Sequence, residues 1–421
     1  MRIPSFSNIG FRMRRGEEIL MYLLGLFSTW QILQFAGFSL STWLTVLTAG
    51  YLVLTRGFSH FRRDWLLTAM LLSVVATFGI SMTAAIPAGY VKASISGTAQ
   101  WIFIFIICVY MRRSNDDRCT SSFFRGLDLS CKVQIIWCLL QIVCNYTLHQ
   151  NLNALVFSSL LSDPSTQLTS TVTGLHWHVA NMTPILVYLY FRQRSLVWKV
   201  LCLIVVFFTQ STTAIIGILL CVFFSVLVFC KRILRSSDHT IAYKTVSVIL
   251  AGIFGAIVIS PLLIPKAWGV ISYLLERLYQ IAHPSPGHES SAVHFNYYRF
   301  LPDILSQLPA HQILAGSGIG TSGYRFTQFL YQFPDAIWIV ESDPVNLILS
   351  QGILGCLLHY LFIGFTAWRL VRRGHSNLAC ALAVLVVCGF AYNNQFLWVQ
   401  LVEFMLYCSV LYPNSSNKKE L

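Results

Sequence analysis

The sequence predicts an all-α, polytopic integral membrane protein with about twelve transmembrane helices and one large extracytoplasmic loop. Three observations predict this class: 56% of the 421 residues are hydrophobic, only 11% are charged, and apolar runs of about twenty residues recur along the chain. A soluble domain carries roughly 25% charged residues, and about twenty apolar residues are needed to cross the hydrocarbon core of a bilayer.

The first apolar run follows a basic segment and lacks the small-residue cleavage site of a signal peptide, so we interpret it as the first span. The predicted spans are 19–35, 38–55, 65–86, 90–111, 129–149, 176–191, 196–210, 211–230, 244–264, 345–368, 377–392 and 395–411. They divide the chain into nine helices with short loops over 1–264, a large loop over 265–344, and three helices with a tail over 345–421. A smaller extracytoplasmic loop is expected at about 150–175.

The distribution of basic residues predicts the topology. If the N-terminus is cytoplasmic, all but five of the 29 lysines and arginines fall on the cytoplasmic side. The five exceptions are Lys92, Lys266, Arg277, Arg299 and Arg325. We therefore expect both termini in the cytoplasm, and we attribute the net charge of +13 to topology rather than to a nucleic-acid partner. The twelve cysteines show no zinc-type spacing, so neither a metal site nor a structural disulfide is expected.

The loop over 265–344 is the polar part of an otherwise apolar chain. Its first part has the spacing of an amphipathic helix, with Ser272 and Glu276 on the polar face. A second short helix is expected to start near Pro302 and to end before Pro309, with Arg299 just ahead of it. The glycine-rich run that follows requires unusual backbone angles or a close approach of the backbone to another group.

This loop carries the residue types that act on an activated lipid-linked sugar. No ATP is present outside the cytoplasm, and a sugar diphosphate on a lipid is already activated. Arginine binds phosphate oxygens in bidentate fashion, which makes Arg277, Arg299 and Arg325 candidates for the diphosphate. An incoming sugar hydroxyl needs a base, for which Glu341, Asp343 and His294 are the candidates. Gly316, Gly318 and Gly320 would allow backbone amides to approach phosphate or sugar.

Each assignment has a structural alternative. Arg299 can form a surface ion pair with Asp303, Arg277 can complement Glu276 or Glu341, Arg325 can anchor the chain at a membrane surface, and the histidines can be solvated loop residues. Glu403 lies in the middle of the last span, where a charge is costly, so we expect it to be functional or paired. His359 is one possible partner, and a protonated, neutral Glu403 is the alternative.

Three short elements carry a resemblance to a known family. They are Ser290–Arg299 (SSAVHFNYYR) with Gly316–Gly320 (GSGIG), Glu341–Asn346 (ESDPVN) leading into Leu347–Gly355, and Thr173–Leu175 (TGL) with Thr209–Ala214. Together with the membrane layout they resemble the Wzy-type polymerases of O-antigen and exopolysaccharide repeat units, within the O-antigen polymerase/ligase superfamily. Ligases of that superfamily usually have a His-Asn pair where this chain has Asp343 and Asn346.

The resemblance implies a membrane glycosyltransferase of the bacterial inner membrane that needs neither a metal nor another cofactor. It would transfer a growing glycan from polyprenyl diphosphate onto an incoming polyprenyl-diphosphate-linked oligosaccharide. Its partners would be the lipid bilayer and a chain-length regulator. His176 and His178, which stand where related polymerases often carry an acidic residue, are assigned to substrate binding. The alternatives are an O-antigen ligase and a flippase or transporter of lipid-linked sugars.

Overall fold

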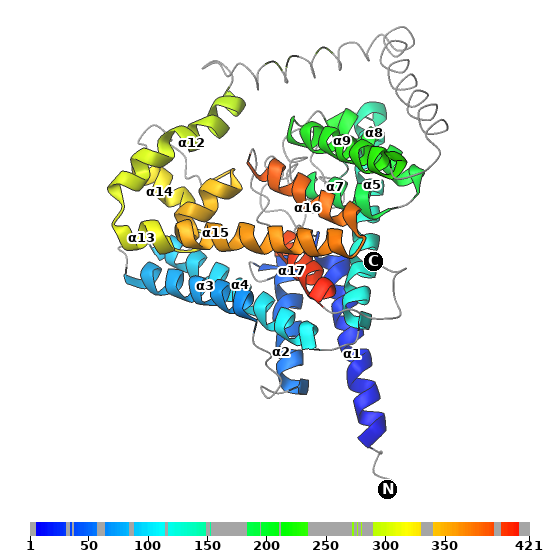
Figure 1. Ribbon diagram of the computed structural model, residues 1–421, viewed down its shortest axis with the longest axis horizontal. Coiled ribbons are helices and arrows are strands. Elements are labelled where there is room, and N and C mark those ends of the chain that lie inside the picture. The colour runs from blue at the N-terminus through cyan, green and yellow to red at the C-terminus, as the bar shows by residue number, and fades with distance from the viewer. Residues whose placement is uncertain are drawn as a thin grey trace.

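The computed structural model describes residues 6–30, 34–35, 38–56, 64–83, 88–113, 117–148, 152, 183–193, 195–209, 212–234, 272, 276, 279, 289–329, 340–390 and 397–411. These residues are almost entirely helical (Figure 1). The helices are α1 Phe6–Phe27, α2 Leu40–Arg56, α3 Trp65–Thr83, α4 Ala88–Arg113, α5 Asp117–Leu148, α7 Thr183–Arg192, α8 Leu196–Thr209, α9 Thr212–Leu234, α12 Glu289–Gln307, α13 Ala310–Ala315, α14 Ser322–Phe329, α15 Asp343–Arg372, α16 Ser376–Gly389 and α17 Leu397–Leu411. Strands β1 Gln34–Phe35 and β2 Phe38–Ser39 pair antiparallel.

The helices have the character of a membrane protein. Four described stretches are long and apolar enough to cross a bilayer: Trp65–Thr83, Tyr90–Met111, Arg118–Cys144 and Asp343–Arg372. Shorter apolar stretches lie in α8, α9, α16 and α17. Large apolar side chains also face outward, and Leu54 of α2 is 86% exposed. The chain is thus an all-α membrane protein. The count of twelve spans stays a prediction, and the span expected at 244–264 lies outside the described residues.

Side-chain contacts establish the relative directions of neighbouring helices. Residue numbers rise together along α1 and α5, where Gly25 lies against Phe123 and Thr29 Oγ1 is 2.6 Å from Ser130 Oγ. Gly25 and Gly126 permit this close crossing, since a side chain at either would collide with the facing backbone. The two helices are therefore parallel, as expected for the first and fifth spans.

The helix pairs that involve α4 also have the directions expected if successive membrane spans alternate in direction. Helices α4 and α17 are parallel, because Gln100 hydrogen-bonds to Gln400 and Cys108 lies beside Cys408 further along both helices. Helices α3 and α4 are antiparallel neighbours in sequence. The directions match those expected of the fourth, twelfth and third spans.

The basic connectors lie at one end of the helix bundle. Arg56 forms an ion pair with Glu17 and also donates to the Tyr110 carbonyl, which joins the ends of α2 and α4. Arg373, just after α15, donates to the Ser409 carbonyl near the end of α17, and α17 ends beside α4. Burial lowers the pKa of His375, and the charges of Arg373 and Arg192 lower it further.

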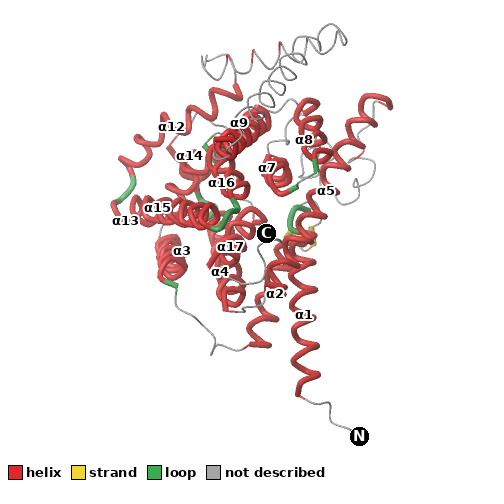
Figure 2. Tube along the Cα trace, turned by 45° about the vertical axis from the view of Figure 1, so that its right-hand side comes forward, coloured by secondary structure: helices red, strands yellow, loops and turns green. Residues whose placement is uncertain are grey.

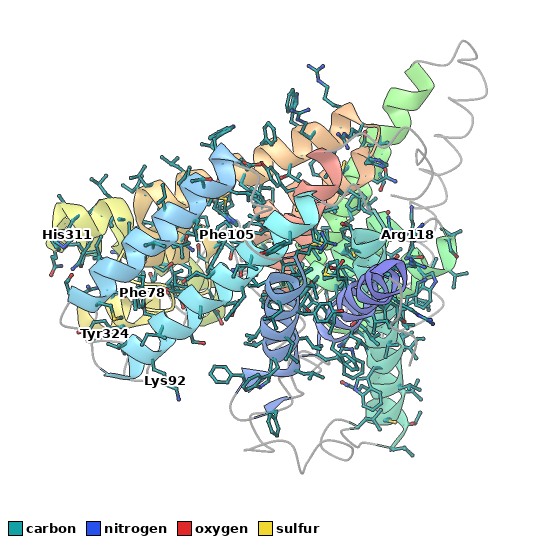
Figure 3. All side chains as sticks on the ribbon, turned by 90° about the horizontal axis from the view of Figure 1, so that it is seen from below. Phe78, Lys92, Phe105, Arg118, His311 and Tyr324 are labelled. Carbon is teal, nitrogen blue, oxygen red and sulfur yellow. The ribbon has the colours of Figure 1, made fainter. Side chains whose placement is uncertain are left out.

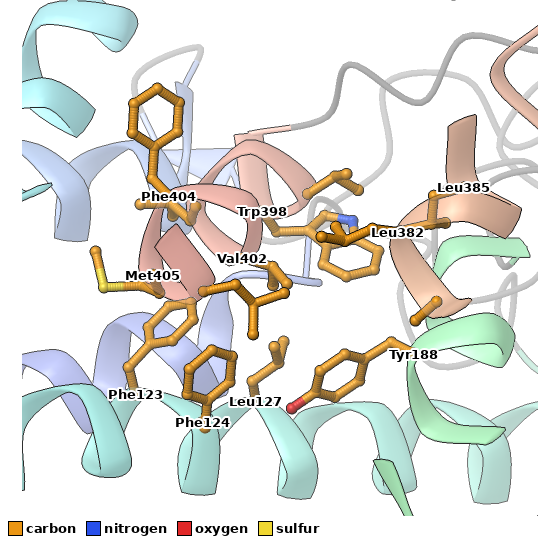
Figure 4. Close-up of a cluster of buried hydrophobic side chains, with 14 of the residues drawn as sticks. Phe123, Phe124, Leu127, Tyr188, Leu382, Leu385, Trp398, Val402, Phe404 and Met405 are labelled. Atoms are coloured by element: carbon orange, nitrogen blue, oxygen red, sulfur yellow. The ribbon is translucent and has the colours of Figure 1, made fainter. Parts of the chain in front are cut away.

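The main core extends through the helices of the bundle, and one part of it lies where α5, α7, α16 and α17 meet (Figure 4). Phe123 and Phe124 of α5 face Met405 of α17, and Trp398 lies between α17 and α16. Each large buried side chain contributes roughly 1.5–3 kcal/mol when it leaves water, although a lipid environment lowers this gain for helix association. Packing and small residues at the crossings therefore stabilise the bundle.

A second, separate core lies at the end of the bundle away from the basic connectors. We call residues 289–329 and 340–351 the cap. Its helices α12, α13, α14 and the start of α15 bury their own apolar side chains, among them Tyr297, Ile304, Phe326, Val345 and Leu349. The cap lies beside α3 in both views of the trace (Figure 1 and Figure 2).

Three predicted boundaries are wrong. Helix α1 begins at Phe6 and ends at Phe27, whereas the expected span was 19–35, because residues 34–35 form the strand ribbon instead. Helix α5 begins at Asp117, twelve residues before the expected 129, because its first turns pack on α1 and α17. The short helix expected from Pro302 is the second half of α12, and Arg299 lies inside that helix rather than ahead of it.

The continuation of α12 through Pro302 has a physical explanation. Proline removes one intrahelical hydrogen bond, yet Pro302 is exposed, so water can satisfy the carbonyl left without a partner. Tyr297 on one side and Ile304 on the other are both buried in the core of the cap. The packing of Tyr297 and Ile304 therefore outweighs the tendency of Pro302 to end the helix.

Candidate functional site

The cap meets the bundle at a crossing of two glycines. Gly316 and Gly352 both have positive φ, 82° and 75°, and a side chain on either would collide with the other segment's backbone. The amides of Ser317 and Gly318 donate to the carbonyls of Leu349 and Ser350, at 3.0 Å each. Those carbonyls end the first turns of α15, which breaks at Gly352. Residues 343–351 thus form a first arm, set at an angle to the rest of α15 (Figure 1).

The glycine loop, residues 316–320, packs against α3 and α4. Thr77 Oγ1 donates to the Ala315 carbonyl at 2.6 Å, and Gly318 lies against Ser81 and Ser94, whose hydroxyls are 2.8 Å apart. Gly320 lies against Ala93 of α4. This environment gives the glycines a packing role. Their predicted approach to phosphate or sugar stays a prediction, and the amides of Ser317 and Gly318 are already used within the cap.

Arg325 holds the glycine loop in place. Its side chain is 6% exposed, its Nε donates to Ser317 Oγ at 3.0 Å, and one Nη donates to Gln312 Oε1 at 2.9 Å. Burial lowers the pKa of Arg325, yet an arginine remains charged at physiological pH. The guanidinium points into the cap instead of extending to a membrane surface. Arg325 is therefore placed to position the loop.

Asp343 is the buried carboxylate of the site. It is 5% exposed, and one of its oxygens lies against Gly389 at the end of α16, where a side chain would collide with it. Its charge acts on Tyr298 of α12. The break at Gly352 separates the first arm, which carries Asp343, from the rest of α15, and the arm places Asp343 against the end of α16.

Two tyrosines of α12 lie near the carboxylates of the cap, Tyr297 near Glu341 and Tyr298 near Asp343. Tyr298 Oη is 2.8 Å from Ser342 Oγ and donates to the Phe390 carbonyl at 2.6 Å, which links α12 to the ends of α15 and α16. Burial, with the nearby charge of Glu341, raises the pKa of Tyr297 to about 12. Burial also raises the pKa of Tyr298. Both tyrosines are neutral at physiological pH and can donate hydrogen bonds.

Arg299 is the exposed arginine of the cap. It lies on α12 next to Tyr298, and its Cζ is 5.7 Å from the centre of the Phe300 ring. Within the part of the chain that the structure describes, no ion pair joins Arg299 to Asp303, one turn away. The ion pair that was the structural alternative for Arg299 is therefore not observed. The guanidinium group of Arg299 is available to bind a phosphate group. His294 lies on the same helix, five residues earlier.

Several predicted site residues lie outside the described residues. They are Arg277, His176 and His178, and their roles stay predictions. Near Arg277, the described positions Ser272 and Glu276 are helical and exposed, in agreement with the polar face expected for an amphipathic helix.

Glu403 is a buried carboxylate of α17, in the bundle. It is 5% exposed, and its Oε2 has no hydrogen-bond partner among the described residues. The predicted partner His359 packs edge-on against Trp101, with ring centres 6.5 Å apart. The pairing of Glu403 with His359 stays a prediction.

Sequence reasoning missed three residues of this arrangement. Tyr298 could have been found because it directly precedes Arg299, but its contact with Ser342 joins residues 44 positions apart. Gln312 has no local signal for its contact with Arg325. Gly352 carried a signal, since a glycine within an apolar helix often marks a break or a close approach.

The described residues bring no group of three or more histidine, cysteine, aspartate or glutamate side chains together as a metal site. No family model matches the chain, and no curated protein matches it significantly. The site must therefore be interpreted from its own chemistry.

Proposed function

We propose that the protein polymerises polyprenyl-diphosphate-linked oligosaccharide repeat units into an O-antigen or exopolysaccharide. The reaction would take place at the periplasmic face of the bacterial inner membrane. In this proposal the protein is a membrane glycosyltransferase, and its donor supplies the energy through a sugar–diphosphate bond. The resemblance of residues 290–299, 316–320 and 341–346 to the Wzy-type polymerases motivates it.

One structural observation supports the proposal most strongly. The cap lies at the end of the bundle opposite the basic connectors, and it holds a buried carboxylate, Asp343, where it meets the bundle. Basic connectors favour the cytoplasmic side of a membrane, so this arrangement favours an extracytoplasmic cap. Arg299 is exposed on the same cap, which puts an anion-binding group and a carboxylate on one unit.

The proposed reaction is a displacement at the anomeric carbon of the donor sugar. A carboxylate removes the proton from the acceptor hydroxyl, whose oxygen forms a bond to that carbon. The bond between the carbon and the diphosphate oxygen breaks, and the electron pair leaves with the polyprenyl diphosphate. Arg299 would stabilise the charge on that leaving group.

Asp343 is our first candidate for the base, and Glu341 and His294 are the others. The neutral hydroxyls of Tyr297 and Tyr298 adjoin the two carboxylates and would orient them or the acceptor. Arg325 acts indirectly. It orders the glycine loop, and that loop is hydrogen-bonded to the first arm of α15. In this proposal Arg325 is a positioning residue.

The sidedness of the cap can be tested with introduced cysteines. We expect Ser306→Cys, on the exposed face of α12, to react with a membrane-impermeant maleimide in intact spheroplasts. Arg372→Cys, exposed at the basic end of α15, should react only after the membrane is lysed. The parent protein measures the background from its native cysteines. Labelling of Ser306→Cys only after lysis would refute an extracytoplasmic cap.

We expect Arg299→Ala to lower polymer yield at least tenfold and Arg299→Lys to retain part of it, since lysine keeps the charge but loses bidentate binding. The measurement is the length distribution of surface glycan in cells. Ser306→Ala, on the same helix, is the control. Polymer of normal length and yield with Arg299→Ala would contradict the assignment.

The length distribution of the surface glycan also distinguishes a polymerase from a ligase or a flippase. A polymerase defect leaves single repeat units attached to the acceptor, whereas a ligase defect leaves none. A flippase defect prevents unpolymerised repeats from reaching the outer leaflet. Accumulation of single repeats in the Arg299→Ala strain therefore supports the polymerase.

A further inference from the structure

A groove lies on the outside of the bundle between α2 and α4. Its volume is about 270 Å³, and the surface that it presents is apolar. Val46 of α2, Ile95, Ala99 and Phe103 of α4, and Leu397 of α17 are among the residues that line it. The candidate site does not include the groove.

One end of the groove has the side chains of a membrane interface. Phe38 and Trp43 meet there edge to face, with ring centres 5.9 Å apart, and Trp43 Nε1 donates to the Phe35 carbonyl of the strand ribbon. Tryptophan is enriched at the level of lipid headgroups. The stem of Lys92 lines the same end, and the exposed side chain extends outward from α4 (Figure 3). The positive charge of Lys92 therefore lies at this end of the groove.

The length of the groove matches one leaflet of a bilayer. From Lys92 to Phe103, α4 rises about 16 Å at 1.5 Å per residue, against a hydrocarbon core of about 30 Å in total. Spread over that length, the volume is that of a single hydrocarbon chain rather than the two chains of a diacyl lipid.

The groove and the candidate site share helix α4. On one face of its first turns, Ala93 and Ser94 lie against the glycine loop, and the ring of Tyr90 packs at a tilt against Tyr324 of α14, with ring centres 4.9 Å apart. On the other face, Lys92 and Ile95 line the groove. A lipid whose chain lies in the groove would thus hold its headgroup beside the cap.

We propose that this groove binds the single chain of a polyprenyl phosphate or diphosphate, with Lys92 at its phosphate group. The identity of the carrier lipid rests on the proposed function, and the chemistry of a single-chain anionic lipid rests on the groove itself. The carrier would be held in the outer leaflet next to the glycine loop. Binding would orient the diphosphate toward the cap before transfer.

Binding to the purified protein, measured by native mass spectrometry, tests the proposal. The probes are undecaprenyl phosphate, uncharged undecaprenol and dioleoyl phosphatidylglycerol. We expect Ala99→Trp, which fills the groove, to weaken binding of undecaprenyl phosphate at least tenfold. Leu54→Trp, a lipid-facing substitution on α2 away from the groove, should leave it unchanged.

Lys92→Gln supplies a second test that does not depend on tolerance of a bulky residue. It should weaken binding of undecaprenyl phosphate about fivefold and leave binding of undecaprenol unchanged. Unaltered binding of undecaprenyl phosphate in both the Ala99 and Lys92 variants would overturn the proposal. Equal affinity for phosphatidylglycerol, with competition at the groove, would also overturn it and indicate an ordinary membrane-lipid site.

The outcomes separate this proposal from the proposed function. If cells that lack the protein make polymer of normal length and yield while Ala99→Trp protein loses the lipid, the polymerase proposal fails and the groove stands. If Arg299→Ala cells lose polymer while Ala99→Trp binds undecaprenyl phosphate normally, the groove fails alone.

Discussion

Asp343→Asn is expected to reduce polymer synthesis by about 100-fold or more while the protein accumulates normally. A general base contributes about 10²–10⁴ to a rate, and asparagine keeps the shape of the side chain but cannot take up the proton. The carboxylate is 5% exposed and fits against Gly389, so the isosteric replacement should not disturb packing. The measurements are surface glycan per cell and the amount of protein in the membrane.

Two further variants show whether a loss of polymer in Asp343→Asn is specific to that carboxylate. Asp303→Asn removes an exposed carboxylate from α12 of the same cap and should leave polymer unchanged. Glu341→Gln tests the other carboxylate, which lies near Tyr297. A large loss with Glu341→Gln and none with Asp343→Asn would make Glu341 the base and our first choice wrong. Poor accumulation of Asp343→Asn would instead indicate a structural role.

Gly352→Ala is expected to be the most destabilising single substitution at the cap, and Gly316→Ala should resemble it. Both glycines have positive φ with ψ near 180°, a conformation that costs alanine about 1–3 kcal/mol, and both lack room for a methyl group against the facing backbone. Overpacking adds about 1–3 kcal/mol, and here the obstacle is backbone rather than a movable side chain. We expect a fall in the thermal transition of the detergent-solubilised protein and loss of polymer.

Gly374→Ala is the matched control for the backbone. Gly374 follows α15 with φ of 85°, but a methyl group there would meet no atom within 4 Å. Only the conformational cost applies, so the thermal transition should fall much less than in Gly352→Ala. Equal shifts for Gly374→Ala and Gly352→Ala would mean that the glycine crossing contributes nothing beyond its backbone angles.

Much of the helical layout could be predicted from local properties. Hydrophobicity and charge belong to each segment by itself, so apolar runs predicted α3, α4 and α15 closely. The boundaries of α1, α5 and α12 were not predictable in this way. At those places distant packing decides where a helix begins or ends, as the burial of Tyr297 and Ile304 on either side of Pro302 shows.

The candidate site was predictable only in part. Arg299 and Asp343 were identified by residue type and by their position in the one large polar segment. The hydrogen bonds of Arg325 to Ser317 and Gln312 could not be foreseen, because they depend on the path of the glycine loop. The roles of these residues in catalysis stay predictions.

By itself, the sequence determined that this chain is a bundle of apolar helices with its basic residues concentrated in connectors and its polar residues in one long segment. Each of these properties follows from the solvent that a local stretch of side chains prefers. Only the tertiary structure decided that the carboxylate of Asp343 lies against Gly389, at the end of α16. That proximity requires the break at Gly352 and the glycine loop that holds it, because a straight α15 would carry the carboxylate away from the core of the bundle.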